Sequence, residues 1–481
     1  MVMRGMMQIV LSSIPVAVLV IALVGLKLPA WKAALAAFAV CAAEAFALRG
    51  VGLGEIATCS LKGASTGLFP IGLIIVAALF TYAVVVESGA EEEIKSGLSS
   101  LSGDKRYLAL LIAWGFGNFM EGMAGFGTAV AIPCAIMVGV GFDPLKAVLC
   151  CLVANTTPTA FASVGVPTFV LASETGLDAG RLASAIGFVQ LAVAFASPFL
   201  ILFITDGLRG LRERWWLALV AAASFIVPWL SLAAWAGCEL PNIAGSVATL
   251  FVLALMGDHS RIDMQRQRWA WCPFAIVVAA LGASAFLPAR WKVSPGFVIL
   301  AAAFVGGLCQ GVRPARLVAL AGKTALKYAP AIGTICLVLA LGKTMGAAGM
   351  TQDLANGLVA ATGKWYPAVS PVVGALGGFV TGSGTSSNVL FGSLQASIGT
   401  TEAEQLVFAA SNIMGAGIGK VICPQSIILG CAATGLAGRE SEVMKRAFRY
   451  FLFILALACA SSFLMVLASK EIECVSQTGL L

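Results

Sequence analysis

Long apolar runs, separated by short polar or basic segments, recur along the whole chain. The runs at 8–28, 31–48 and 215–236 carry few or no charged residues. As an α-helix, the last of them would measure about 33 Å, and the hydrocarbon core of a bilayer is about 30 Å thick. The pattern therefore predicts a protein built from membrane-spanning helices.

The fold class follows from the number and spacing of these runs. We expect an all-α, polytopic membrane protein with about 12–14 transmembrane helices. The first run follows Arg4 and is long for a cleaved signal peptide, so we interpret it as the first transmembrane helix. The complete set of predicted spans is 8–28, 31–48, 66–87, 107–120, 144–172, 182–205, 215–236, 241–257, 270–288, 294–310, 329–348, 367–378, 403–435 and 447–469.

Composition supports the membrane interpretation. Of the 481 residues, 59% are hydrophobic and 11% are charged, whereas a soluble domain carries about 25% charged residues. The net charge of +7 comes from short basic segments such as 206–214 and 439–449, which is typical of cytoplasmic loops and does not indicate nucleic-acid binding. We expect a multi-pass protein of the bacterial inner (plasma) membrane, in contact with membrane lipid.

The sequence contains no recognisable set of catalytic or metal-binding residues. The 13 cysteines form no CxxC pair and lie mostly within apolar runs, and the single histidine, His259, lies in a polar segment. Gly415–Lys420 resembles a phosphate-binding loop only faintly, because Met414 and Val421 occupy positions where that motif needs glycine and Ser or Thr. We therefore expect no metal, no cofactor and no enzymatic activity.

Two regions, 113–168 and 374–426, depart from plain apolar helices. Each begins with a cluster of glycine and small polar residues, continues with an apolar stretch, and reaches a second polar break after a similar interval. This weak internal repeat predicts two inverted repeats with broken helices and re-entrant hairpins. We place the repeats in residues 1–214 and 215–481.

These breaks predict a transport site. Lipid cannot satisfy free peptide groups, so an unwound segment at membrane depth must lie inside protein or beside a wet cavity. Paired breaks in two halves are typical of the substrate site of a secondary transporter, where helix N-termini face an anion. The alternative is close helix packing through small residues. Against that alternative stand the amides of Asn118, Asn155, Asn388 and Asn412, which lipid would not solvate.

Two isolated charges sharpen the hypothesis. Glu121 is the only charged residue between Tyr107 and Phe142, and Lys420 is the only one between Gln405 and Gly438. A charge at the centre of a membrane helix costs about 2.5–3.5 kcal/mol, so it usually faces a partner or a water-filled path. We interpret Glu121 as the proton-coupling group and Lys420 as the partner of a substrate carboxylate. The alternative is snorkelling to the interface or one structural ion pair.

In these two regions the chain resembles the L-lactate permease family. The blocks that carry the resemblance are Glu121–Pro133, Gly141–Lys146, Asn155–Phe161, Thr381–Asn388 and Gly419–Ser426. The resemblance implies proton-coupled uptake of lactate, glycolate or a similar 2-hydroxymonocarboxylate. It places substrate-binding residues at Thr128, Asn155, Ser383, Thr385, Ser386, Asn388, Lys420 and Gln425, with Asn412 in the neighbouring polar break and Glu121 as the proton-coupling residue.

One departure from the family leaves the substrate open. The family commonly has Asp where this chain has Gly384. A missing acid there favours a second hypothesis, a permease of the same build for another organic anion, such as a sulfonated or larger carboxylate. A channel or a membrane-embedded sensor is the hypothesis from a different class. A sensor needs a soluble signalling domain, and no stretch of this sequence is long and polar enough to form one.

Overall fold

A computed structural model of the chain describes residues 2–26, 28–125, 127–260, 263–285 and 293–477. Within these ranges the backbone is almost entirely helical and contains no strand, which confirms the all-α prediction. The α-helices are α1 (Val2–Val20), α2 (Ala30–Arg49), α3 (Leu53–Thr66), α4 (Gly72–Glu87), α5 (Ala90–Ser100), α6 (Lys105–Ala109), α7 (Gly117–Met123), α8 (Thr128–Gly139), α9 (Pro144–Ala154), α10 (Ala162–Thr175), α11 (Ala179–Trp235), α12 (Pro241–Leu255), α13 (Met264–Ala285), α14 (Pro295–Cys309), α15 (Pro314–Ala347), α16 (Met350–Thr362), α17 (Tyr366–Thr381), α18 (Gly384–Ala396), α19 (Glu402–Gly419), α20 (Pro424–Thr434) and α21 (Glu440–Gln477).

Many of these helices are long and apolar enough to cross a bilayer, which confirms a multi-pass membrane protein. The described residues contain six such spans, and the pair α9 and α10, bent by 62° at its break, makes a seventh. The prediction of 12–14 transmembrane helices stays a prediction. The six spans are Ala30–Arg49, Leu53–Glu87, Ala179–Trp235, Pro314–Ala347, Glu402–Thr434 and Glu440–Lys470.

The two predicted spans at 182–205 and 215–236 both lie within α11, which consists of helical segments that meet at a kink. The backbone leaves helical geometry at Asp206, Gly207 and Arg214, so the two predicted spans are separate helical segments on either side of these residues. The predicted boundary between the halves, at residue 214, falls at the last of these bends. The division into halves stays a prediction.

The order of elements that begins at α3 occurs again from α15. The first series of elements opens with the 35-residue span Leu53–Glu87, and the second opens with the 34-residue helix α15. A left-handed glycine, Gly89 or Gly349, then leads into a short helix, α5 or α16. Two interrupted helices and one long helix complete each series. This order is what two repeats require, and their inverted orientation stays a prediction.

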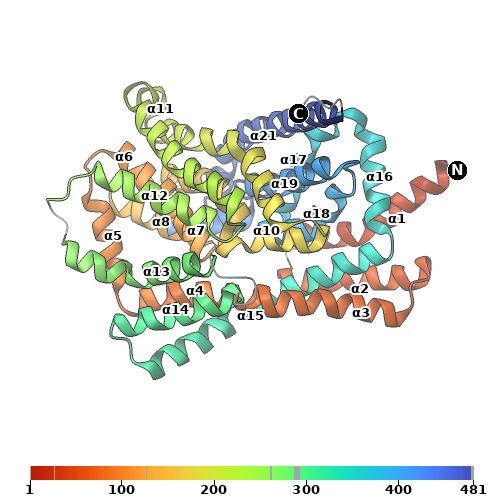
Figure 1. Cartoon of the computed structure of the whole chain (residues 1–481), viewed down its shortest axis with the longest axis horizontal. Helices are drawn as coiled ribbons and strands as arrows, with labels where there is room; N and C mark the ends of the chain where they lie inside the picture. Colours follow the sequence, from red (N-terminus) through yellow and green to blue (C-terminus); the bar gives the residue numbers. More distant parts are fainter. Residues whose placement is uncertain (1, 27, 126, 261–262, 286–292, 478–481) are drawn as a thin grey trace.

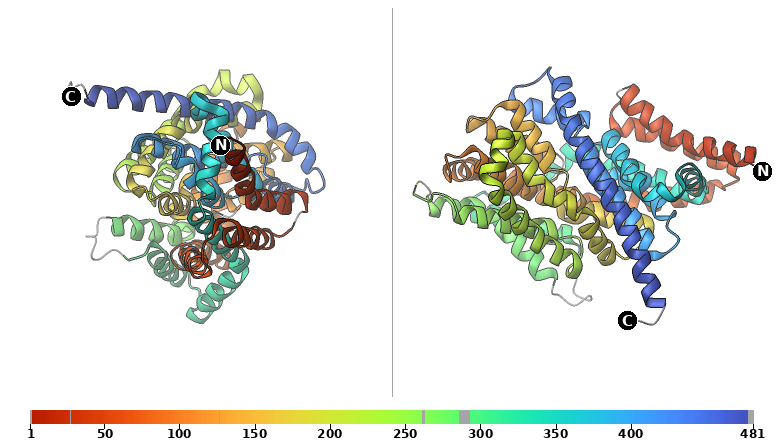
Figure 2. Two further views of the ribbon diagram at one scale, coloured as in Figure 1. Left: turned by 90° about the vertical axis from the view of Figure 1, so that its right-hand side faces the viewer. Right: turned by 90° about the horizontal axis from the view of Figure 1, so that it is seen from above.

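The helices form two layers, which Figure 1 shows one above the other. The lower layer consists of α2–α4 and α13–α15, with α1 at its end; we call it the support layer. The upper layer consists of α6–α12 and α17–α21; we call it the site layer. The short helices α5 and α16 connect the layers, which are also separate in the side view (Figure 2).

Glycines hold α17 and α19 unusually close together inside the site layer. A Cβ atom added to Gly378 would overlap the carbonyl oxygen of Ala416, and one added to Gly374 would overlap that of Asn412. Gly415 and Gly419 face the backbone of α17 in the same way. Helix packing through small residues, the alternative raised from the sequence, therefore applies to this pair of helices.

We predict that Gly378→Ala destabilises the protein and Gly322→Ala does not. The added methyl group at 378 has no space, and overpacking of this kind costs about 1–3 kcal/mol. Gly322 lies in α15 with open space around its Cα, so alanine there is neutral or stabilising by about 0.5–1 kcal/mol. The measurement is the thermal unfolding midpoint of each variant in detergent. Equal midpoints for the two variants would contradict the packing interpretation.

Candidate functional site

Four helix interruptions surround one pocket of about 470 Å³. The interruptions separate α7 from α8, α9 from α10, α17 from α18, and α19 from α20. Both predicted break regions, 113–168 and 374–426, therefore contribute to the same cavity. Polar side chains on its wall are Glu121, Asn155, Thr159, Ser163, Thr381, Ser383, Thr385, Ser386, Lys420, Gln425 and Ser426.

The pocket lies between the two layers. All of its polar groups named above come from the site layer. The support layer contributes Trp31 from the first turn of α2, and Pro330, Thr334 and Ile335 from the middle of α15. The support layer thus covers the pocket mainly with apolar groups, and most of the polar side chains come from the other layer.

The positive ends of four helices converge on this pocket. α8, α10, α18 and α20 all begin at its wall, and the regular turns of α10 start after its left-handed residue Gly165. The first amide groups of an α-helix have no partner within the helix, and each N-terminus carries about half a positive charge. Four such ends favour an anion in the pocket.

The sequence at 381–386 explains the break between α17 and α18. Gly382 adopts a left-handed conformation with φ 66°, and its N–H donates to Gly378 at 2.9 Å, which ends α17. Ser383 is extended, and its Oγ accepts from the N–H of Ser386 at 3.3 Å as the N-cap of α18. The glycine stops one helix and the serine starts the next, so the turn presents its polar groups to the pocket.

The turn that opens α10 is strained. Ser163, Val164 and Gly165 have φ values of 44°, 58° and 81°, although a β-branched residue such as valine rarely adopts this conformation. The left-handed conformation costs on the order of 1–3 kcal/mol at each of Ser163 and Val164, whereas Gly165 adopts it without strain. The Ser163 hydroxyl donates to the carbonyl of Ala124 at 2.9 Å, so this turn is tied to the break between α7 and α8.

Lys420 and Glu121 form a buried ion pair within the pocket wall. The Lys420 Nζ lies 2.7 Å from Glu121 Oε1 and donates also to Thr159 Oγ1 at 3.2 Å. The side chains are 10% and 3% exposed, respectively. Glu121 Oε2 has no hydrogen-bond partner among the residues that the structure describes. The ion-pair alternative raised from the sequence therefore applies, but this pair lies at the pocket and joins two distant segments.

Helix dipoles act differently on the two charges. Lys420 caps the C-terminus of α19, where a cation is favourable, whereas Glu121 lies in the last turn of α7, where an anion is unfavourable. Glu121 therefore depends on Lys420 for compensation. Within the described part of the chain, no group of three or more His, Cys, Asp or Glu side chains forms a set of metal ligands.

The structure places most of the residues predicted from the sequence at this pocket. Asn155 caps α9, and its Oδ1 is buried without a partner in the described residues. Glu121, Lys420, Ser383, Thr385, Ser386 and Gln425 also line the wall. Their proximity follows from the fold, while their roles in binding stay predictions.

The remaining three residues predicted for substrate binding, Thr128, Asn388 and Asn412, are not among the lining residues. Asn412 Nδ2 donates to Asn388 Oδ1 at 2.9 Å, and Asn388 Nδ2 donates to the carbonyl of Pro167 at 2.8 Å. The Thr128 hydroxyl donates to Gly125 at 2.8 Å. These bonds hold α10, α18 and α19 and the turn before α8 in place, so the three residues support the pocket wall from behind.

Sequence reasoning missed four polar side chains of the site layer that the structure places on the pocket wall: Thr159, Ser163, Thr381 and Ser426. Thr159 and Ser426 lie within the conspicuous segments 155–161 and 419–426, so their positions were detectable. Nothing in the sequence indicates that Ser163 is left-handed, because that conformation is imposed by the surrounding helices.

We predict that substitutions of Lys420 and Glu121 have strongly non-additive effects on the free energy of unfolding of the protein. Lys420→Met alone leaves a buried carboxylate unpaired and costs about 3–5 kcal/mol, whereas Lys420→Met with Glu121→Gln recovers most of that loss. The measurement is a double-mutant cycle of thermal unfolding in detergent.

Arg181 and Glu402 supply the matched control pair. They also join two distant helices, but their side chains are 59% and 51% exposed. Because exposed pairs contribute about 0–1 kcal/mol, Arg181→Met should have little effect. Similar losses of folding stability for Lys420→Met and Arg181→Met would show that the buried pair stabilises the protein no more than the exposed pair does.

Comparison with known proteins identifies the family of this chain. The sequence model of the L-lactate permease family matches residues 8–268 and 270–468. An L-lactate permease of Streptococcus iniae is 37% identical over 70% of this chain and 79% of its own length. An L-lactate permease of Escherichia coli K12 is 32% identical over 92% of this chain and 93% of its own length. The glycolate permease GlcA of the same organism is 32% identical over 80% of this chain and 82% of its own length. The chain belongs to the L-lactate permease family.

Proposed function

We propose that this protein is a secondary active transporter of small monocarboxylates such as L-lactate or glycolate, working as a proton symporter in the bacterial inner membrane. The observation that carries the proposal is a single buried ammonium group, Lys420, in a pocket where four helix N-termini converge. The names of the relatives, L-lactate permease and glycolate permease, support the same substrate class.

The proposed ligands divide between the two ends of a 2-hydroxymonocarboxylate. Lys420 and the first amides of α18 and α20 bind the carboxylate. Asn155, Thr385 and Gln425 hydrogen-bond the hydroxyl group, with Ser383 and Ser386 nearby. In this proposal Thr128, Asn388 and Asn412 act through the backbone that they hold.

Proton coupling follows from the charge of the pocket. The Glu121–Lys420 pair is neutral as it stands, so a bound monoanion would leave one uncompensated buried charge. A proton on Glu121 removes that charge and releases Lys420 from its present partner. Because an unpaired buried charge is costly, the anion and the proton are expected to bind together. Glu121 is thus the proposed proton-coupling residue.

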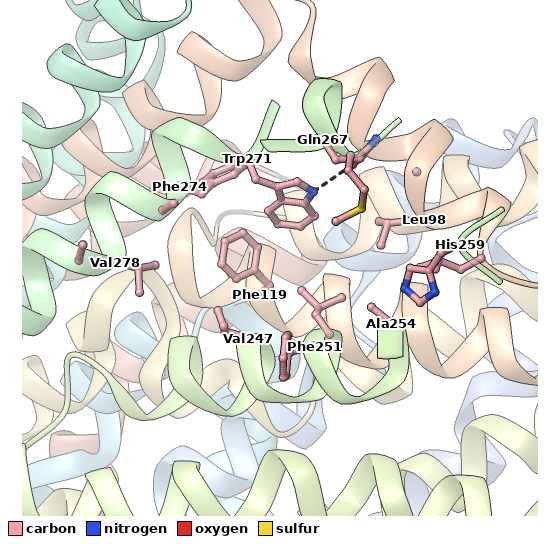
Figure 3. A pocket seen from close by; sticks show the side chains of 16 residues that line it. Leu98, Phe119, Val247, Phe251, Ala254, His259, Gln267, Trp271, Phe274 and Val278 are labelled. Atoms are coloured by element: carbon pink, nitrogen blue, oxygen red, sulfur yellow. Dashed lines mark hydrogen bonds between the residues drawn. The ribbon is translucent and has the colours of Figure 1, made fainter. Parts of the chain in front are cut away.

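Alternating access is proposed to move the two layers against each other. Lys343 on α15 and Glu174 on α10 lie 3.1 Å apart, and among the described residues theirs is the one ion pair between the layers. Another contact between the layers is aromatic: Phe119 on α7 packs edge-on against Trp271 and Phe274 of α13 (Figure 3). Apolar surfaces of this kind slide without losing hydrogen bonds, so the ion pair is the expected latch.

A different organic anion is the second candidate, suggested by Gly384. The structure shows that a Cβ added there would lie 2.7 Å from Thr159 Cγ2 and 2.8 Å from Ile413 Cδ1. Neighbouring side chains thus already fill the space that an acidic residue would use. Gly384 therefore offers no additional room for a larger anion.

We predict that purified protein in liposomes accumulates labelled L-lactate or glycolate when the outside is acidic, and that a protonophore collapses the accumulation. A sodium gradient without a pH gradient should not replace the proton. Unlabelled sulfonates and larger carboxylates added as competitors test the second candidate. Uptake that merely equilibrates with the electrochemical gradient would indicate a channel and contradict the proposal.

Substitution of the ion pair separates binding from coupling. Lys420→Met should abolish uptake, because the carboxylate loses its cation. Glu121→Gln should retain exchange of internal for external substrate but lose accumulation driven by the pH gradient, because glutamine carries no exchangeable proton. Unchanged uptake in either variant would remove the assigned role.

We predict that neutralising the latch with Glu174→Gln and Lys343→Met together changes the maximal uptake rate by severalfold, with little change in KM. The pair holds one arrangement of the layers and lies outside the pocket lining, so it affects the transition between states and not binding. Initial rates over a range of substrate concentrations provide the measurement. A change in KM alone would argue against the latch.

A further inference from the structure

An apolar groove of about 590 Å³ lies on the surface between α11 and α21, away from the pocket. Aromatic side chains line it: Phe195, Phe199 and Phe203 from α11, and Tyr450 and Phe453 from α21. Phe195 and Phe453 are 47% and 54% exposed. Both helices are membrane spans, so the groove faces the bilayer.

The direction of the two helices places the groove beside the end of the span. The Ser461 hydroxyl donates to the carbonyl of Val189 at 2.7 Å, deep within both helices. From that contact, α21 runs back toward its N-terminus as α11 runs forward toward the bend at Asp206 and Gly207. Figure 2 shows α21 crossing the molecule alongside α11.

Among the described residues, the groove has cations only at its end beside the N-terminal part of α21. Arg449 lines it, and Lys445 lies one helical turn earlier on the same face of α21. Among the described residues no carboxylate forms an ion pair with either side chain. The nearby Glu442 is already paired with Arg439 at 2.7 Å and with Arg446 at 3.3 Å. Two exposed cations thus remain available at the mouth of an aromatic groove.

A second apolar groove provides a contrast within the same molecule. It lies between α5, α12 and α13 and contains Phe251, Trp271 and His259 (Figure 3). Among the described residues its lining includes no lysine or arginine, and Gln267 at its rim is already hydrogen-bonded to the carbonyl of Glu93 at 2.6 Å. An apolar chain fits either groove, but among the described residues only the α11/α21 groove has a cation within its lining.

We propose that the α11/α21 groove binds a phospholipid with an anionic headgroup. One acyl chain lies along the aromatic side chains, and the headgroup phosphate contacts Arg449 and Lys445. This combination of apolar groove and basic mouth is the chemistry by which membrane proteins select anionic lipids. The proposal does not depend on the transported substrate, because none of these residues lines the pocket between the layers.

The test measures lipid retained by the full-length protein. Purified protein is exchanged into mixed micelles that contain phosphatidylglycerol and phosphatidylcholine with identical acyl chains, and bound lipid is counted by native mass spectrometry. Wild-type protein should retain phosphatidylglycerol preferentially. Arg449→Gln and Lys445→Gln should each reduce that preference about fivefold, since each basic residue near a headgroup contributes a factor of this size.

Two controls keep the result specific to this groove. Arg268→Gln removes an exposed cation of α13 that lines neither groove, and it should leave the preference unchanged. Ala196→Trp fills the α11/α21 groove and should displace lipid of either headgroup, whereas Ala275→Trp in the other groove should not affect phosphatidylglycerol retention. Equal retention of the two lipids, or a preference that survives Arg449→Gln with Lys445→Gln, would overturn the proposal.

Discussion

Peptide groups that leave a helix within a membrane must find partners in the protein, because hydrocarbon offers none. The chain interrupts four helices and gathers all four interruptions around one cavity. Backbone that would be costly in lipid becomes useful there, since the free amides of the new helices face the same space. The architecture of both layers follows from keeping these ends enclosed.

Charge neutrality is the second constraint on the site. Lys420 and Glu121 each lie at the C-terminal end of a helix, where the helix dipole stabilises the lysine cation and destabilises the glutamate anion. The ion pair between them therefore compensates the charge of Glu121. Thr159 holds the ammonium group from a third segment. In the proposed mechanism, this neutral pair links the arrival of an anion to a change in the protonation of the carboxylate, so binding and coupling would depend on the same two side chains.

Glycine and asparagine serve different purposes in neighbouring positions. Gly382 ends a helix through its left-handed conformation, whereas Gly378 allows two helices to approach. Asn155 faces the pocket, whereas Asn412 hydrogen-bonds to Asn388 behind it. One asparagine thus faces the cavity while two others hold the wall from behind, although the local sequences around them are similar. Only their placement on the helix and the packing of that helix decide between the two.

The sequence by itself determined the membrane class, the all-α fold and the position of the breaks, because each depends on local composition over a few helical turns. It also singled out Glu121 and Lys420, since a lone charge within an apolar run is visible without a structure. Tertiary structure alone decided that these two meet, because they are separated by 299 positions in the chain. It also imposed the left-handed turn at Ser163, since contacts from distant helices outweigh local conformational preference.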